Sequence, residues 1–290
     1  MSKKHFFIVG VLLVFIMSAT ACGLHFGLHG GDTLKRAKEE GVVTIGFANE
    51  KPYAYKDETG KVTGEAVEVA RSVFKKMGIH KIEPVLVDFG SLIPGLKSGR
   101  FDVITAGMYI TPTRCKEVVF ADPEYKIGEA IAVKKGNPKK LHSYEDIAAH
   151  PQVKVAVMKG AVEVSYLKKS GVKENQMIIV PDQPSAISAL ESGRVDAITM
   201  TGPSLRAMME STGARDIEEV KDFQQPIVDG KSVLGYGAAA FRKEDKQFRD
   251  AFSRELAEMK KSGALLNVLK LFGFTEENLP DKKADELCKP

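Results

Sequence analysis

Residues 96–105 read Leu-Lys-Ser-Gly-Arg-Phe-Asp-Val-Ile-Thr, and residues 190–199 read Leu-Glu-Ser-Gly-Arg-Val-Asp-Ala-Ile-Thr. The two stretches are identical at seven of their ten positions, in one register. Each is typical of a helix that ends on a glycine, followed by a polar turn and a buried strand. We therefore expect two lobes that are built alike.

Strand-like and helix-like segments alternate on both sides of these stretches. In the first half, the pattern predicts strands at residues 42–47, 85–87 and 101–105 and helices at 65–77 and 92–97. In the second half it predicts strands at 153–158, 177–180 and 195–199 and helices at 162–169 and 185–190. This alternation indicates an α/β fold in which each lobe has a central, mainly parallel sheet flanked by helices.

The chain is expected to cross between the lobes twice. A strand at residues 129–134 leads into the second lobe, and a Gly/Ala-rich apolar run at 232–241 leads out of it. An amphipathic helix at 246–261 and a short terminal helix at 264–272 follow. Two crossings make a hinge, and hinged lobes can close on a ligand. We assign residues 33–131 plus 235–290 to lobe 1, which is discontinuous, and residues 132–234 to lobe 2.

The N-terminus is typical of an export signal. Lys3 and Lys4 precede an apolar run at residues 6–17, and small residues lead to Cys22. The run is shorter than the roughly 18 to 20 residues that cross a bilayer. We expect residues 1–21 to be removed as a signal peptide. Cys22 resembles a bacterial lipoprotein site, although Ala19 stands where leucine is usual, and simple cleavage nearby is the alternative.

A lipid on Cys22 would make residues 22–32 a tether and hold the exported chain in the periplasm or on the outer face of the cell membrane. The whole chain has 42 basic and 38 acidic residues, and loss of the two signal lysines brings its formal charge from +4 to near +2. This balance argues against a nucleic-acid partner, which requires a concentrated basic face. Outside the cytoplasm, Cys115 and Cys288 are expected to form a disulfide, with two buried free thiols as the alternative.

Candidate binding residues lie in three loops that follow predicted strands, where open α/β sheets place their ligand crevices. Tyr53, Phe89 and Tyr109 could form aromatic walls around one cavity and contact a flat or cationic group. Glu50 is an anionic acceptor, and Arg114 can hold a carboxylate through two hydrogen bonds. The alternatives are that each aromatic packs only its own loop and that both charges are exposed. Enzymatic motifs, metal-binding motifs and cofactor-binding motifs are lacking in the sequence, so we expect no catalytic residue and no cofactor.

Three motifs resemble those of ectoine/hydroxyectoine-binding proteins of ABC importers, within the polar amino-acid-binding family. They are Gly-Phe-Ala-Asn-Glu-Lys-Pro-Tyr at 46–53, the stretch at 89–102, and Gly-Met-Tyr-Ile-Thr-Pro-Thr-Arg-Cys at 107–115. The resemblance covers roughly residues 33 to 290. It implies a two-lobed periplasmic-binding-protein-like fold of type II, a membrane permease as partner, and a monomer. The element Thr-x-x-Arg, here Thr111 to Arg114, is common to the wider family and implies a carboxylate binder.

The resemblance also implies a role for each candidate residue. Arg114 would hold the ligand carboxylate, Glu50 would pair with the N–C–N cation, and the three aromatics would box the ring. The chain departs from the family at residues 159–163, where Ala161 and Val162 keep backbone amides for a carboxylate but lack the usual hydroxyl. From lobe 2 we also name Asp182, for which hinge or turn duty is the alternative.

Rival functions remain open at this point. The same site could bind another zwitterion, such as proline, glutamine or a betaine, whereas a fully cationic ligand such as arginine would need additional carboxylates. An enzyme similar to cyclohexadienyl dehydratases would need an acid or base near the ring, for which Glu50 is the strongest candidate. A sensor domain is a third alternative.

Overall fold

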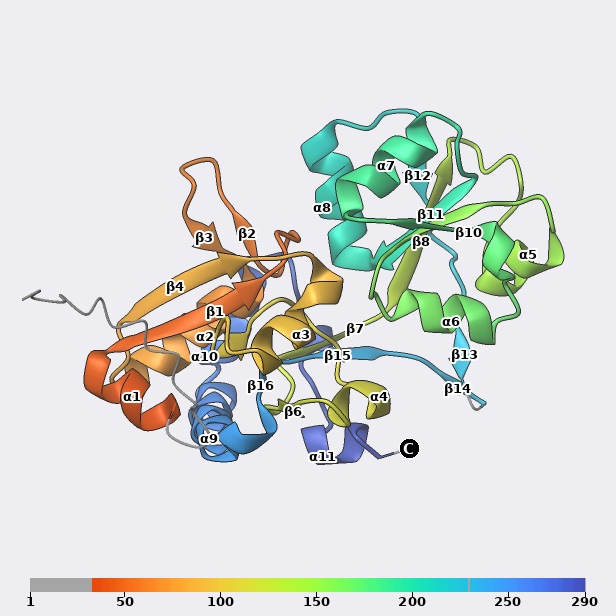
Figure 1. Ribbon diagram of the computed structural model, residues 1–290. Helices are drawn as coiled ribbons and strands as arrows, with labels where there is room; N and C mark the ends of the chain where they lie inside the picture. Colours follow the sequence, from red (N-terminus) through yellow and green to blue (C-terminus); the bar gives the residue numbers. More distant parts are fainter. Residues whose placement is uncertain (1–32, 229, 290) are drawn as a thin grey trace, which may run out of the picture.

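The computed structural model describes residues 33–228 and 230–289 (Figure 1). The predicted signal peptide, the lipidation of Cys22 and the tether lie outside these residues. The described chain folds into two α/β lobes, which confirms the predicted fold class. No helix among the described residues is long and apolar enough to span a bilayer.

Lobe 1 is built on a sheet with the strand order β4-β1-β5-β16-β6. Its strands are β1 (Val42–Phe47), β4 (Lys81–Leu86), β5 (Val103–Ile104), β6 (Val119–Phe120) and β16 (Ala240–Phe241). One face is covered by α2 (Glu65–Lys76), α9 (Lys246–Lys261) and α10 (Ala264–Lys270), and the other by α3 (Leu92–Lys97). The first helix, α1 (Thr33–Glu40), packs against β1 and α9. The lobe therefore has a core on each side of its sheet.

Lobe 2 repeats this plan with the strand order β10-β9-β11-β8-β12. Its strands are β8 (Glu129–Lys134), β9 (Val155–Met158), β10 (Met177–Val180), β11 (Ala197–Thr201) and β12 (Ile217–Glu219). The helices α7 (Gln183–Glu191) and α8 (Gly202–Thr212) cover one face, and α5 (Tyr144–Ala149) and α6 (Glu163–Lys169) cover the other. Both lobes thus use one strand order, as the repeated stretches predict.

Both sheets are mixed, with four strands that run in one direction and one strand that runs against them. In each sheet the three strands of the alternating segment pair in parallel, and the remaining two strands pair antiparallel. In lobe 2 the first of these antiparallel strands is β8, which brings the chain in from lobe 1, and in lobe 1 it is β16, which brings the chain back. A strand that enters by a crossing has no βαβ connection to force it parallel.

The hinge between the lobes contains a short antiparallel pair. Strand β7 (Tyr125–Ile127) pairs with β15 (Gly235–Gly237), and β7 continues directly into β8. Strand β8 pairs with β11 from Glu129 to Val133, so the expected domain boundary at 131/132 falls inside this strand. We propose to place the boundary before Glu129, with the other domain limits as predicted.

Several smaller elements complete the described chain. They are β2 (Tyr55–Lys56), β3 (Val62–Thr63), α4 (Pro112–Cys115), β13 (Ile227–Val228), β14 (Lys231–Ser232), α11 (Ala284–Leu287), and the 3-10 turns Phe89–Ser91, Glu174–Gln176, Lys243–Asp245 and Glu276–Asn278. The disulfide between Cys115 and Cys288 forms as predicted, with Cα atoms 5.7 Å apart. It joins α4 to the segment after α11.

Candidate ligand-binding site

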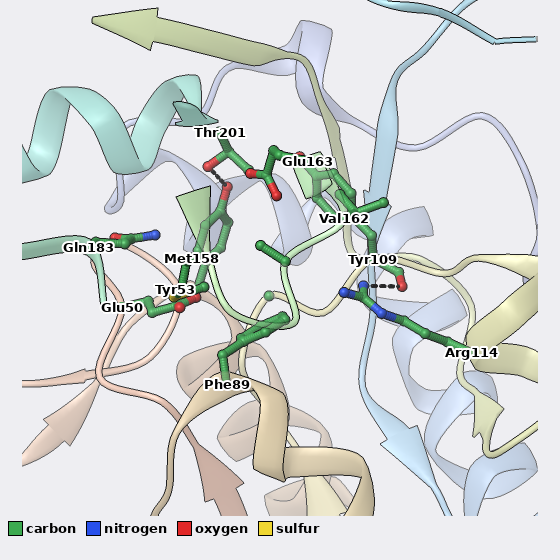
Figure 2. A pocket seen from close by; sticks show the side chains of 12 residues that line it. Glu50, Tyr53, Phe89, Tyr109, Arg114, Met158, Val162, Glu163, Gln183 and Thr201 are labelled. Carbon is green, nitrogen blue, oxygen red and sulfur yellow. Dashed lines mark hydrogen bonds between the residues drawn. The ribbon is translucent and has the colours of Figure 1, made fainter. Parts of the chain in front are cut away.

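A pocket lies where strand ends of both lobes meet (Figure 2). Lobe 1 and its loops provide Glu50, Tyr53, Phe89, Gly107, Tyr109 and Arg114, and lobe 2 provides Met158, Ala161, Val162, Glu163, Gln183 and Thr201. The five lobe 1 residues that the sequence predicts to contact the ligand directly all line this one pocket. They are Glu50, Tyr53, Phe89, Tyr109 and Arg114.

The aromatic residues from lobe 1 pack on one another as well as lining the pocket. The rings of Tyr53 and Tyr125 stack with centroids 5.2 Å apart, and the Tyr109 ring meets Tyr125 edge-on at 6.5 Å. Phe89, at the start of the 3-10 turn after β4, lies 5.5 Å from the Arg114 guanidinium carbon. Tyr125 thus serves as a buried support behind two of the three predicted walls.

Arg114 is held by its own loop and by the opposite lobe. Thr111 caps α4, its Oγ1 accepting from the Arg114 backbone N–H at 3.2 Å, so Thr111 orients the helix and does not line the pocket. The guanidinium donates from Nη1 to the Tyr109 carbonyl at 2.8 Å and from Nη2 to the Gly160 carbonyl at 3.1 Å. A guanidinium has five N–H donors, so donors remain for a ligand carboxylate.

Glu50 faces the same pocket with an unsatisfied oxygen. The side chain is buried, and within the described residues its Oε1 has no hydrogen-bond partner. Burial, and secondarily the nearby Glu163, raises the pKa of Glu50 well above its usual value, while Arg114 lowers it. The raised pKa favours the protonated carboxyl when no ligand is bound, and a cationic ligand group that donates hydrogen bonds would stabilise the carboxylate.

The wall from lobe 2 contains polar residues that the sequence analysis did not name. Val162 lines the pocket as expected, together with Glu163, Gln183 and Thr201. Asp182 does not line it, because its side chain accepts from the Ser185 backbone N–H at 2.8 Å and caps α7. The next residue, Gln183, points to the pocket instead, and its Oε1 is buried without a partner in the described chain.

Glu163 belongs to a buried pair of carboxyl groups. Glu129, at the start of β8, is also buried, and burial followed by the proximity of Glu163 raises its pKa well above the usual value. Burial likewise raises the pKa of Glu163, with Arg114 acting in the opposite direction. The pair therefore retains a proton to a higher pH than two exposed glutamates would.

The two lobes touch directly around the pocket. The Tyr53 and Thr201 hydroxyls lie 2.7 Å apart, and Ser204 Oγ donates to the Lys51 carbonyl at 2.7 Å. Gly160 has a φ of +82°, and a Cβ there would meet the Gly90 Cα at 2.7 Å, so this approach of two backbones requires glycine. The structure therefore shows the lobes closed upon each other.

Comparisons with known proteins agree with this architecture. The model of the bacterial extracellular solute-binding proteins, family 3, matches residues 43–273. The probable amino-acid ABC transporter periplasmic-binding protein of Sinorhizobium fredii is 38% identical over 278 residues, covering 94% of this chain and 91% of that protein. The crystal structure of EhuB in complex with hydroxyectoine has a TM-score of 0.82 and 34% identity, covering 90% of this chain and 99% of the other.

A further structural relative bears on the enzymatic alternative. The ancestral amino acid-binding protein AncCDT-1, a precursor of cyclohexadienyl dehydratase, has a TM-score of 0.72 and 29% identity, covering 83% of this chain and 99% of the other. Its name is that of a binding protein, as is the name of the Sinorhizobium relative. The family match, the relatives and the two closed lobes agree, and we conclude that this chain belongs to the bacterial extracellular solute-binding proteins of family 3, as the solute-binding component of an amino-acid-type ABC transporter.

Proposed function

We propose that the chain captures ectoine or hydroxyectoine for uptake by an ABC importer and performs no turnover. The observation that carries this proposal is the placement of Arg114 and Glu50 on one pocket with aromatic walls. Arg114 would hold the ligand carboxylate, and Glu50 would accept hydrogen bonds from the delocalised N–C–N cation. The similarity to EhuB with hydroxyectoine supports this ligand class.

The unsatisfied acceptors favour a cation that carries N–H groups. Glu50 Oε1 and Gln183 Oε1 are both buried without partners among the described residues, and both lie away from Arg114 (Figure 2). A quaternary ammonium group has no N–H and would leave these acceptors unpaired, which is a large penalty in a site closed to water. Betaines therefore fit this pocket less well than a ring with two N–H donors.

Calorimetric titration of the mature chain from Gly23 tests the ligand. The ligands are ectoine, hydroxyectoine, glycine betaine, proline and glutamine, titrated into the parent chain, Arg114→Ala and Tyr109→Ala. We expect tight ectoine-class binding that each substitution weakens by more than about 2 kcal/mol. Arg206→Ala, which removes an exposed ion pair with Glu219, is the matched control and should bind as the parent does. If neither ectoine gives a heat of binding and another zwitterion does, the ectoine proposal is rejected and the role as a solute-binding component is kept.

A cationic amino acid such as arginine is the second candidate, and a specific observation favours it. Glu163 and Glu129 are additional buried carboxyl groups, one lining the pocket and one behind it. A second cationic group on the ligand could pair with them and displace the proton that they retain. Titration in two buffers with different ionisation enthalpies distinguishes the candidates, because a zwitterion would release protons from Glu50 alone, whereas arginine would also release protons from the pair.

Cell-surface placement and assembly are part of the same proposal. We propose export, lipidation at Cys22, and docking of the closed monomer on permease subunits. Membrane fractionation of the full chain and of Cys22→Ala tests the anchor: the parent should sediment with membranes and the variant should not. Equal sedimentation of both would reject lipidation at this residue.

A further inference from the structure

The segment that follows α10 runs across the hinge and ends at the binding loop. We call residues 275–289 the C-terminal strap. It begins with the 3-10 turn Glu276–Asn278, which contacts β7, continues through α11, and ends at the disulfide between Cys288 and Cys115. Figure 1 shows α11 near α4, beneath the hinge strands β7 and β15. None of the strap residues lines the pocket.

Asp281 in the strap contacts both hinge strands at the same point. Its Oδ1 accepts from the Tyr236 hydroxyl of β15 at 2.8 Å, and its Oδ2 accepts from Lys126 Nζ of β7 at 3.0 Å. Tyr236 and Lys126 are partners in the β7–β15 register. The two strands pair over only three residues each, and the Asp281 carboxylate links the side chains of the central pair. These bonds therefore add to the few contacts that hold the two strands together.

Other strap contacts converge on the same short pair of strands. Asn278 Nδ2 donates to the Lys126 carbonyl at 3.2 Å, and Lys282 Nζ lies 5.5 Å from the centroid of the Tyr236 ring. The Ala284 backbone N–H donates to Asp122 Oδ1 at 3.1 Å, just before β7 begins. Side chains and backbone of the strap therefore hold the hinge from one side.

The far end of the strap is tied to the residue next to Arg114. Helix α4 has four residues, none of which is fully buried, and Cys115 packs against the core of lobe 1. Its fixed points are the Thr111 cap, the contacts of Arg114 itself and the disulfide at Cys115. A movement of the strap is thereby passed to the backbone that carries the guanidinium.

We propose that the C-terminal strap positions the hinge and the Arg114 loop relative to each other, with Asp281 as the positioning residue at the hinge and the Cys115–Cys288 disulfide as its tie to Arg114. The strap limits how far β7 and β15 separate when the lobes open. It also makes the Arg114 loop move together with the hinge strands, because the disulfide connects the two. This role does not depend on which solute the pocket takes.

The exposure of Asp281 separates positioning from bulk stability. Hydrogen bonds from Tyr236 and Lys126 hold the pKa of this carboxyl down at about 2, so it is ionised across the ordinary pH range. Its side chain is 59% exposed, and exposed ion pairs contribute little to global stability. Loss of Asp281 should therefore loosen the hinge locally without lowering the overall unfolding free energy.

Hydrogen–deuterium exchange on the oxidised mature chain, without ligand, tests the hinge contact. Asp281→Ala removes both bonds, whereas Asp281→Asn keeps an acceptor for Tyr236. In Asp281→Ala we expect amides of residues 125–127 and 235–237 to exchange about tenfold faster, with a smaller rise in Asp281→Asn and none in β1 or β9. Asp285→Asn, an exposed strap residue, is the control. Unchanged hinge exchange, or a rise spread evenly over lobe 1 with a lower melting temperature, would overturn the proposal.

Reduction of the disulfide tests the tie to Arg114. In the parent chain with a reducing agent, and in Cys115→Ser/Cys288→Ser, we expect faster exchange at residues 111–118 while β1 and β9 stay protected. In the oxidised chain, Asp281→Ala should raise the amide exchange rate at residues 111–118. In the reduced chain, where that rate is already raised, the same substitution should add nothing to it. Independent, additive effects would refute the coupling. Should the double serine variant fail to fold, the Asp281 series on the oxidised chain still decides the hinge role.

Discussion

Lobe 1 and lobe 2 contain the same hydrogen bond from the backbone to an aspartate, but the charged side chains around that aspartate differ. In lobe 1, Asp102 Oδ2 accepts from the Thr44 backbone N–H at 3.0 Å, and in lobe 2, Asp196 Oδ2 accepts from the Lys154 backbone N–H at 2.8 Å. The aspartates occupy one position of the repeated stretch, and they join the turn to β1 in lobe 1 and to the residue before β9 in lobe 2. Repetition of the bond shows that this position is set by the fold.

The aspartate of lobe 1 also pairs with two cations. Arg36 donates to Asp102 at 2.7 Å, and the buried Arg242 lies 3.4 Å from the same oxygen. Arg242 follows β16, the strand that returns from lobe 2, and Arg36 is in α1. The aspartate of lobe 1 therefore joins the first and last parts of the discontinuous lobe, a task that the continuous lobe 2 does not have.

The largest expected effect comes from replacing these two aspartates one at a time and comparing the losses of stability. Asp102→Ala should lower the free energy of unfolding by about 3–4 kcal/mol, because it removes the bonds to Thr44, Arg36 and Arg242 together. Arg242 keeps its ion pair with Asp245 at 2.7 Å. Asp196→Ala removes the shared backbone bond and should cost about 1–2 kcal/mol. Urea unfolding of both variants without ligand measures the two losses. Equal losses would mean that the cations add nothing to the aspartate of lobe 1.

The lobes also bury carboxyl groups for different purposes. The pair Glu129 and Glu163 reaches the pocket, whereas Glu65 and Glu124 are buried inside lobe 1, away from it. Burial raises the pKa of Glu65 well above its usual value, with Glu124 adding to the rise, and raises the pKa of Glu124 to about 8. The first pair reaches the pocket through Glu163, and neither member of the second pair lines it.

The second prediction uses pH to separate the pairs. The folded chain keeps the Glu124 proton up to about pH 8, but the unfolded chain loses it near 4.5. The folded state therefore binds more protons in this window, and stability falls as pH rises through it. Glu124→Gln should remove roughly 2–4 kcal/mol of this fall. Urea unfolding from pH 5 to 9 measures it, with the exposed Glu244→Gln as control. A parallel fall in Glu124→Gln would assign the effect to other groups.

The third prediction compares carboxylates on opposite walls of the pocket. Glu50→Gln should weaken ectoine-class binding by about 2 kcal/mol, because the ligand cation loses its anionic partner. Glu163→Gln should leave a zwitterion bound nearly as well, since the pair with Glu129 already retains a proton. Calorimetry on the two variants with ectoine and with arginine measures this contrast. A larger loss from Glu163→Gln than from Glu50→Gln would move the cation to lobe 2 and favour arginine.

Sequence patterns located most elements, and the misses have physical causes. The segments at 42–47, 92–97, 129–134, 177–180 and 246–261 coincide with β1, α3, β8, β10 and α9. Strand β4 was predicted at 85–87 but spans Lys81–Leu86. It is an edge strand with exposed Lys81, Glu83 and Pro84, so it lacks the apolar run by which buried strands are found.

The polar and aromatic residues of the site were predictable on the lobe 1 wall, whereas of the two residues expected from lobe 2 only Val162 lines the pocket. The lobe 1 residues are aromatic or charged and follow predicted strands, so the sequence pattern identifies them as candidates. Glu163 stands in the first turn of a helix, where an acidic residue has an ordinary role toward the helix dipole, and Gln183 and Thr201 carry no charge. Only closure of the lobes brings these side chains to the cavity. The signal that could have found them is the same strand-end rule applied to β9, β10 and β11.

The smallest expected effect tests how the two walls are held together. Ser204 Oγ, in α8 of lobe 2, donates to the Lys51 carbonyl of lobe 1, and this bond exists only while the lobes are closed. Ser204→Ala should weaken ligand binding by about 0.5–1.5 kcal/mol, the usual net value of one hydrogen bond. Ser211→Ala is the matched control, because Ser211 in the same helix bonds only to the Met208 carbonyl. Stopped-flow measurement of ligand release should assign the loss to faster dissociation, since closure follows encounter. A slower association with unchanged dissociation would place this contact before closure and would mean that the lobes meet at Ser204 before the ligand is enclosed.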